Sequence, residues 1–172
     1  MSLHEDLLDQ ASQLSAIDPL RPRQANLRRA VSSAYYALFH FVIARASAEL
    51  VGAAFHRREL RHLISRLFDH AEMKSACASF GGGTLPVAVT RTLGPLPVPE
   101  PVRDLAKTFV MAQDFRHQAD YDLAGTFSRT EVAQFVKRIR QDMNSFDQMP
   151  ASDAKSLFLI ALMTWDKVKR RA

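Results

Sequence analysis

The stretch RQANLRRAVSSAYYALFHFVIARASAELV, residues 23–51, is the longest periodic run of the chain and decides the fold class. Apolar side chains recur along it at spacings of three and four residues, which is the repeat of an α-helix. Its apolar stripe covers most of the helix circumference, as is typical of a central helix in a bundle. The stripe consists of Leu27, Ala30, Val31, Ala34, Tyr35, Leu38, Phe39, Phe41, Val42, Ala46 and Leu50.

Similar patterns on both sides of this run predict further helices. We expect them over residues 5–17, 56–79, 102–120, 128–146 and 152–170. Ser128 and Glu131 have the spacing of a capping box, in which each side chain bonds the backbone amide of the other residue. The helix over 56–79 is expected to turn one apolar face inward and most of its arginines to water. That inward face consists of Leu60, Leu63, Ile64, Leu67, Phe68 and Ala71.

Residues 79–101 interrupt the helical pattern. They hold five of the eight prolines and four of the six glycines, which predicts one long Gly/Pro-rich loop. The short run 87–89 is compatible with a strand but does not by itself predict one. The triple glycine 81–83 has no Walker lysine after it, so we interpret it as part of the loop rather than as a phosphate cradle.

The prediction is therefore an all-α fold, an up-and-down helical bundle of four to five helices with a C-terminal helix and one long loop. A chain of 172 residues fits a single domain, 1–172, with a core over about 5–148 and an extension helix over 152–170. The extension helix has apolar residues on many faces. It therefore either closes the core or binds a partner.

Composition limits the class of protein. With 47% hydrophobic and 24% charged residues, the chain resembles a soluble globular protein. The longest nearly apolar run, 157–165, is about half of the ~20 residues that a bilayer requires. The single cysteine, Cys77, allows no internal disulfide and favours a reducing compartment. Because the first residues show no secretory leader, we expect a cytoplasmic protein with no membrane partner.

The charge of the chain is +5 and is unevenly distributed. Residues 21–66 hold nine arginines and only two glutamates, and a second basic cluster, residues 167–171, closes the chain. Guanidinium groups suit phosphate because each can pair with two oxygens at once. The charge therefore either marks a nucleotide or nucleic-acid partner or simply solvates helix faces.

Metal chemistry finds little support. No two of the six histidines stand three or four residues apart, the spacing that places two ligands on one helix face, and no second cysteine is present. We expect no metal and no cofactor.

A polar stripe lies on the long helix over 23–51. Arg29, Ser32, Ser33, Tyr36 and His40 follow one another at short helical spacings, on a helix that is otherwise apolar. Half-buried polar groups need partners. The end of the helix over 102–120 offers four of them, namely Arg116, His117, Asp120 and Tyr121.

Two interpretations of these two stripes remain open. In the first, they form a hydrogen-bond network that fixes the register of the helices. In the second, they form an anion site, where Arg29 and Arg116 contact phosphate and His40 or Tyr121 supplies proton transfer. The candidate phosphate-binding residues are Arg29, Ser33, Tyr36, His40, Arg116 and Asp120, and the candidate catalytic residues are Arg116, Tyr121 and His40.

Two sequence motifs resemble the signatures of HEPN domains. The run RRAVSSAYYALFH, residues 28–40, resembles a prokaryotic signature that reads RRA-x-S-x-AYYA-x-FH. The run RHQADY, residues 116–121, resembles the second signature of that branch, R-x-x-ADY. The resemblance covers roughly residues 5–148. It implies a four- or five-helix, up-and-down bundle that usually forms a homodimer.

The resemblance also implies a function. Many HEPN proteins are endoribonucleases, often toxins paired with a minimal nucleotidyltransferase antitoxin, and others bind nucleotides or RNA without catalysis. The active ribonucleases have a histidine four to six residues after an arginine. Arg116 matches that arginine, but Tyr121 stands in the histidine window, and the nearest histidine is the adjacent His117. Arg57 and His62 have the nominal spacing on a different helix, which we interpret as chance.

Three hypotheses follow from the sequence. The first is a HEPN-like module that binds a nucleotide or RNA with little or no catalysis. The second is a metal-independent endoribonuclease toxin that uses Arg116 with Tyr121, His117 or His40. The third is an interaction subunit, either a homodimer or the partner of a nucleotidyltransferase.

Overall fold

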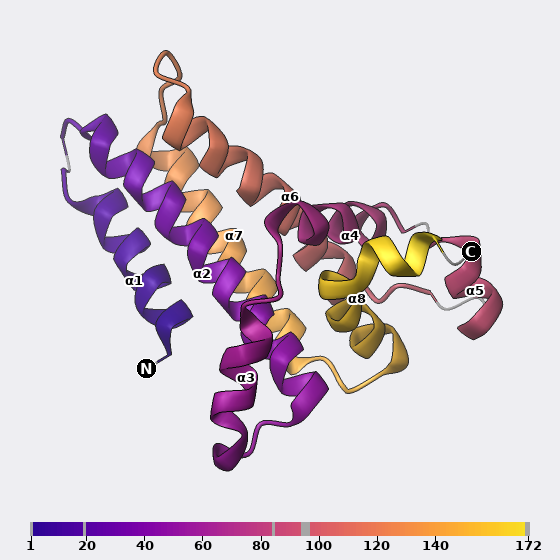
Figure 1. Ribbon diagram of the computed structural model, residues 1–172. Helices are drawn as coiled ribbons and strands as arrows, with labels where there is room; N and C mark the ends of the chain where they lie inside the picture. Colours follow the sequence, from indigo (N-terminus) through magenta and orange to yellow (C-terminus); the bar gives the residue numbers. More distant parts are fainter. Residues whose placement is uncertain (1, 19, 84, 94–96, 171–172) are drawn as a thin grey trace. The chain divides into compact units, whose positions relative to one another are not determined.

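The computed structural model is all-helical over the residues it describes, which are 2–18, 20–83, 85–93 and 97–170 (Figure 1). The predicted all-α class is thereby confirmed. The described residues do not include Pro19. They also leave out part of the predicted Gly/Pro-rich loop, and Arg171 of the C-terminal basic cluster. The helices are α1 (Leu3–Ala16), α2 (Gln24–Val51), α3 (Arg58–Ser65), α4 (His70–Gly82), α5 (Val87–Leu93), α6 (Glu100–Tyr121), α7 (Arg129–Gln148) and α8 (Asp153–Arg170), with a short 3₁₀ turn at Phe55–Arg57.

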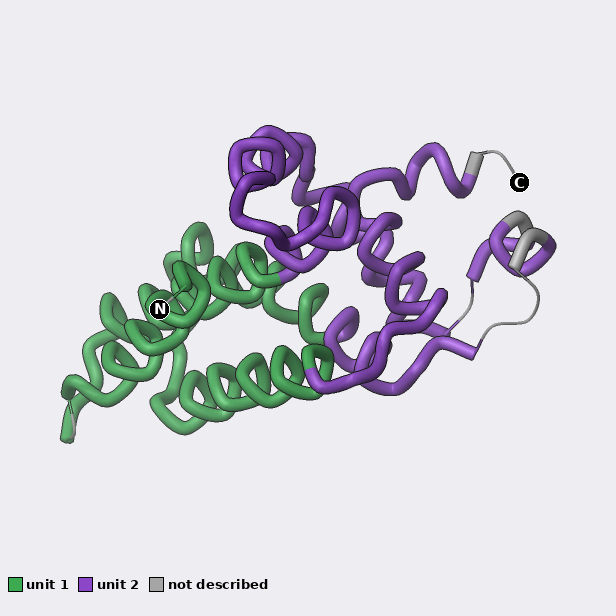
Figure 2. The backbone as a smooth tube through the Cα atoms, turned by 90° about the horizontal axis from the view of Figure 1, so that it is seen from below, with its two compact units in different colours: residues 1–41, 108–147 green, residues 42–107, 148–172 purple. Residues whose placement is uncertain are grey.

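The chain divides into two compact units (Figure 2). Unit 1 consists of residues 1–41 and 108–147, and unit 2 consists of residues 42–107 and 148–172. The two long helices α2 and α6 each contribute one part to each unit.

Unit 1 is built from α1, the first part of α2, the second part of α6, and α7 (Figure 2). Aromatic side chains fill its interior. The ring of Phe41 meets that of Phe146 on α7 edge to face at 6.2 Å, and Tyr35 lies 6.0 Å from Phe109 on α6. The residues of the predicted apolar stripe that belong to this unit are buried, except Phe39, which is half-buried. The longest periodic run of the sequence therefore supplies the core of this unit.

A polar contact also links α6 to α7 within unit 1. The fully buried Thr108 donates its hydroxyl hydrogen to Oδ2 of Asp142 at 2.6 Å and accepts a hydrogen bond from Nε of Arg138 at 2.9 Å. At the start of α7, the amide of Glu131 donates to Oγ of Ser128 at 3.1 Å, which is half of the predicted capping box. The other half is the weaker bond from the Ser128 amide to the Glu131 carboxylate at 3.4 Å.

Unit 2 has its own core, centred on α4 and α8. Phe80 on α4 meets Phe158 at 5.2 Å and Trp165 at 5.8 Å, both of which are buried side chains of α8. The C-terminal helix thus closes a core, which is one of the two roles that its apolar faces allowed. Burial raises the pKa of the Cys77 thiol on α4, so this cysteine stays protonated within that core.

The predicted helix over 56–79 is in fact two helices. α3 ends at Ser65, and α4 begins after Asp69, whose carboxylate accepts hydrogen bonds from the amides of Ala71 and Glu72. An N-cap aspartate of this kind starts a new helix because it satisfies amides that have no partner in the preceding turn. Periodicity alone did not reveal this break, because the apolar spacing continues through it.

The stretch 79–101 is not one continuous loop. Gly81 and Gly82 complete α4, and residues 87–93 form α5, a short helix rather than a strand. A side chain at Gly81 would begin only 3.0 Å from Cγ of Lys107 and 3.3 Å from its backbone nitrogen. The glycine therefore permits the close approach of α4 to the beginning of α6, and its role is packing.

The inward orientation predicted for six apolar side chains of residues 60–71 is wrong for most of them. Leu60, Leu63 and Leu67 are exposed, with Leu63 at 62% of its full accessible surface. No residue of α3 is buried. The physical reason is that, within the part of the chain that the structure describes, nothing covers these side chains.

Candidate functional site

The polar stripes of α2 and α6 meet inside unit 1. Ser32 donates its hydroxyl hydrogen to Oδ1 of Asp120 at 2.7 Å, and Nη2 of Arg116 donates to the hydroxyl of Tyr36 at 3.3 Å. Ser32 and Tyr36 are four residues apart on α2. Their partners Asp120 and Arg116 are four residues apart on α6 in the opposite order, so the two helices run antiparallel here. We call Ser32, Tyr36, Arg116, Asp120 and Tyr121 the Arg116 cluster.

The guanidinium of Arg116 is the centre of this cluster. Its Nε lies 2.7 Å from Oδ2 of Asp120 in an ion pair one helical turn apart, and its Cζ lies 5.7 Å from the ring centroids of both Tyr36 and Tyr121. Partial burial by itself would lower the pKa of Arg116, but the oxygens of Tyr36, Asp120 and Tyr121 outweigh it and raise that pKa. The arginine therefore holds a permanent positive charge between two aromatic rings.

One side of the cluster is open to solvent. The side chain of Arg116 is 26% exposed, and Tyr121, the last residue of α6, is 62% exposed. The ring of the exposed His117 lies 5.0 Å from the ring of Tyr121, one turn away on the same helix. An imidazole, a phenol and a guanidinium thus come together where a ligand could reach them.

Arg28 holds the end of α6 that carries these groups. Its guanidinium donates to the carbonyl oxygens of Ala119 at 2.9 Å and Asp122 at 2.7 Å, and also to that of Gly125. The last carbonyls of a helix have no partner within it, and an arginine both bonds them and complements the negative end of the helix dipole. The polar stripe predicted from the sequence contains Arg29 rather than Arg28. The missed signal was the four-residue spacing of Arg28, Ser32 and Tyr36.

The other predicted residues lie elsewhere. Ser33 donates its hydroxyl hydrogen to Oε1 of Gln10 on α1 at 3.0 Å, so it turns away from α6. Arg29 is exposed, and no hydrogen bond or ion pair joins its side chain to another described residue. His40 is half-buried, with its ring 5.6 Å from that of Phe39. Of the six predicted phosphate-binding residues, the described contacts bring together Tyr36, Arg116 and Asp120.

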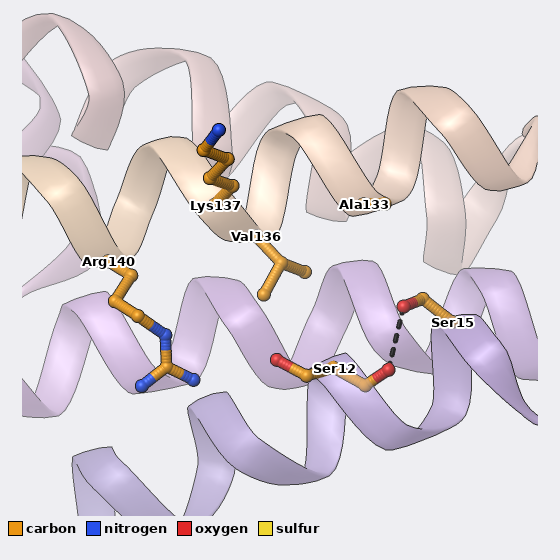
Figure 3. A pocket seen from close by; sticks show the side chains of 6 residues that line it. All are labelled: Ser12, Ser15, Ala133, Val136, Lys137 and Arg140. Atoms are coloured by element: carbon orange, nitrogen blue, oxygen red, sulfur yellow. Dashed lines mark hydrogen bonds between the residues drawn. The ribbon is translucent and has the colours of Figure 1, made fainter.

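A separate pocket of about 210 Å³ lies between α1 and α7 of unit 1 (Figure 3). Its polar groups are largely engaged. The hydroxyl of Ser15 donates to the carbonyl of Ser12 at 2.8 Å, and Arg140 forms an ion pair with Asp9 at 2.7 Å. Lys137 directs its amine away from α1 (Figure 3). The pocket therefore lacks the converging charges of the Arg116 cluster and is the weaker candidate.

Two further properties concern the described part of the chain only. Within it, no group of three or more His, Cys, Asp or Glu side chains could hold a metal ion. No single described helix is long and apolar enough to cross a bilayer, although α2 and residues 55–65 pass that test as a pair bent by 105°.

No family model, curated protein or solved structure matches this chain. The geometry of the Arg116 cluster therefore carries the functional argument.

Proposed function

We propose that the chain is a HEPN-like helical module, with the up-and-down bundle of that family, and that its Arg116 cluster binds the phosphate of a nucleotide or of RNA. One observation carries the proposal. Arg116 is a permanently charged, partly exposed guanidinium that lies between two tyrosine rings, one of which is largely open to solvent. Arginine and exposed aromatic rings are the two groups that bind the phosphates and bases of single-stranded nucleic acid.

The contacts of Arg116 suggest how a phosphate would bind. Asp120 forms an ion pair with the guanidinium beside Nε, and Tyr36 accepts one Nη2 hydrogen, which leaves further N–H groups for a phosphate oxygen. The ion pair with Asp120 partly neutralises the site, so binding will depend on additional groups. Tyr121 is one of these, since stacking of a base on an aromatic ring contributes about 1–3 kcal/mol.

Fluorescence anisotropy with a labelled single-stranded RNA, at low and at moderate salt, tests this proposal. We expect saturable binding by the wild type that weakens as salt rises. Arg116→Ala should weaken binding about tenfold or more, because a hydrogen bond to a charged group contributes about 1.5–3 kcal/mol. ATP and other nucleotides serve as competitors and show which ligand the site prefers.

Arg140→Ala is the matched control. It also removes one guanidinium and one ion pair of 2.7 Å in unit 1, but outside the cluster. Its affinity should stay within a few-fold of the wild type. Equal losses in the two variants would show that binding follows net charge rather than this site, and the proposal would fail.

A second candidate function, metal-independent RNA cleavage, is favoured by the tilted contact of the His117 ring with that of Tyr121 beside Arg116. In such a reaction a base takes the proton of the ribose 2′-hydroxyl, the 2′-oxygen attacks phosphorus, and the 5′-oxygen leaves with a proton from an acid. Arg116 would stabilise the charge on the phosphoryl oxygens. Histidine suits the proton transfers near neutral pH, whereas a tyrosine, with a reference pKa of about 10, does not suit the role of base.

Cleavage of a labelled RNA in the presence of a chelator tests this candidate. His117→Ala should abolish cleavage and leave RNA binding within a few-fold of the wild type, and His40→Ala tests the other predicted histidine in the same way. If the wild type binds RNA and leaves it intact, the chain is a binding module only.

A further inference from the structure

The helix α3 displays an apolar ridge in unit 2 that no part of the described chain covers. Phe55 is 84% exposed, Leu63 62%, Leu67 60% and Leu60 46%. We call these four residues the α3 ridge. Leu60 and Leu63 lie three residues apart on α3 and share one face, while Phe55 lies in the 3₁₀ turn before the helix and Leu67 in the turn that follows it. A group of large exposed apolar side chains along one short segment indicates a surface that binds something.

The ridge is held in a fixed conformation by the segment that precedes it. Nη1 of Arg61 donates to the carbonyls of Gly52 at 2.8 Å and Ala54 at 2.9 Å, and Nη1 of Arg57 donates to that of Val51 at 2.7 Å. Gly52 has a φ of +84°, which a glycine adopts without strain and which ends α2. The two arginines thus fasten α3 to the end of α2, and the ridge is a structured feature.

The surroundings of the ridge are basic. Arg58 and Arg66 are exposed, and no hydrogen bond or ion pair joins either guanidinium to another described residue. Residues 55–70 hold four arginines and three histidines against only Glu59 and Asp69. Two copies of this chain that met face to face on the ridge would bring these positive charges together. The charge therefore disfavours a second copy and favours an anionic partner.

We propose that the α3 ridge binds the surface of an anionic phospholipid membrane. A helix with an exposed apolar face and an arginine-rich remainder lies in the membrane interface, with its apolar side chains at the boundary of headgroups and acyl chains. Arg58 and Arg66 would meet lipid phosphates, where each basic residue strengthens attraction to an anionic leaflet. The proposal departs from the sequence expectation of no membrane partner. It requires no membrane-spanning helix and is independent of the function proposed for the Arg116 cluster.

Sedimentation with vesicles tests this directly. The full chain is mixed with vesicles of phosphatidylcholine alone or of phosphatidylcholine with phosphatidylserine. We expect sedimentation with the anionic vesicles and little with the neutral ones. Leu63→Glu should weaken the binding about tenfold or more, since burial of one leucine side chain outweighs a factor of ten in affinity. Paired substitution of Arg58 and Arg66 by glutamate should abolish the preference for anionic lipid.

Matched controls separate the ridge from general effects of charge and hydrophobicity. Leu123 in unit 1 is 93% exposed, so Leu123→Glu makes the same chemical change outside the ridge and should leave sedimentation unchanged. Paired substitution of the exposed Arg21 and Arg29 by glutamate makes the same change of charge outside the ridge and should leave the preference for anionic lipid in place. In Leu63→Trp, the emission of the new tryptophan should shift to shorter wavelength with anionic vesicles only, while the buried Trp165 provides a constant background.

Three results would overturn the proposal. The first is no sedimentation of the wild type with either vesicle. The second is sedimentation of Leu63→Glu equal to that of the wild type. The third is a wild-type dimer in analytical ultracentrifugation that Leu63→Glu dissociates and Leu123→Glu does not, which would assign the ridge to contact between copies of this chain.

Discussion

The helices α2 and α3 combine the same ingredients, an apolar stripe and several arginines, and the structure uses them in opposite ways. On α2, Leu38 and its neighbours are fully buried in unit 1. On α3, Leu63 and its neighbours are largely exposed. The apolar pattern is equally regular in both. Periodicity therefore shows which side chains lie on the same face of a helix. It does not show whether another element packs against that face.

The arginines of the two helices differ in the same way. Arg28 on α2 donates hydrogen bonds to the carbonyl of Ala119 in the last turn of α6 and to two carbonyls of the loop that follows, and so fastens this end of α6 to α2. Arg58 on α3 and Arg66 just after it make no such contact with another described residue. An arginine on a helix face that packs against another helix thus stabilises that packing. An arginine beside a face that the described chain leaves uncovered is available for a partner.

The largest expected loss of stability comes from a substitution in the buried stripe of α2. Leu38→Ala should lower the free energy of unfolding by about 2–5 kcal/mol, because the fully buried side chain leaves a cavity that its neighbours refill only in part. Denaturant unfolding followed by circular dichroism measures the effect. A loss below about 1 kcal/mol would mean that the interior of unit 1 is loosely packed and that the contrast with α3 is weaker than the structure indicates.

Arg28→Ala should have the next largest effect, a loss of about 1–3 kcal/mol in the free energy of unfolding. It leaves the carbonyls of Ala119 in α6 and of Asp122 just after it without their donor, and it removes a charge that complements the helix dipole. Arg29→Ala is the control, since this neighbouring side chain is exposed and forms no hydrogen bond or ion pair with another described residue, and it should change stability by less than about 0.5 kcal/mol. Equal effects of the two substitutions would contradict the anchoring role of Arg28.

Much of the fold follows from the sequence alone. The all-α class, the length of α2 and the capping box at Ser128 all depend on local patterns, which the sequence contains in full. The break between α3 and α4 depends on Asp69, whose carboxylate competes with a continuing helix for the same amides. The exposure of Leu63 depends on which elements pack against α3, and no local pattern contains that information.

The candidate site was predictable to the extent that it depends on helix spacing. Tyr36, Arg116 and Asp120 were expected to meet, and the antiparallel contact of α2 with α6 brings them together. The sequence pattern also predicts Ser33 on this face, but one residue on a helix is a rotation of about 100°, which is enough to direct it toward α1. Which residue of the pair Ser32 and Ser33 faces α6 therefore depends on how the helices pack. The same holds for Arg28 and Arg29.

A smaller effect is expected where the segment before α2 is held by a surface carboxylate. The Asp18 carboxylate forms an ion pair with Nε of Arg23 at 3.2 Å and accepts a hydrogen bond from Nδ2 of Asn26 at 2.7 Å, and these contacts lower its pKa. A carboxyl group with a lowered pKa in the folded state stabilises the fold above its unfolded value of about 3.9, and loses that contribution as the pH falls through the lowered value. The stability difference between the wild type and Asp18→Asn should therefore be present near neutral pH and vanish in acid. A titration of the carboxyl carbon by NMR would contradict this if the midpoint lay at or above the reference value.

The smallest expected effect completes the comparison with Leu38→Ala, because it makes the same substitution on the exposed helix. Leu63→Ala should change the free energy of unfolding by less than about 0.5 kcal/mol, since the side chain buries little in the folded chain and alanine is a good helix former. Measured in dilute protein, the two leucine substitutions then differ only in whether the face is covered. A loss of 2 kcal/mol or more for Leu63→Ala would show that this face is buried in solution. A neutral result would show that the exposed leucine contributes nothing to stability at this position, so that its side chain is free to contact a partner.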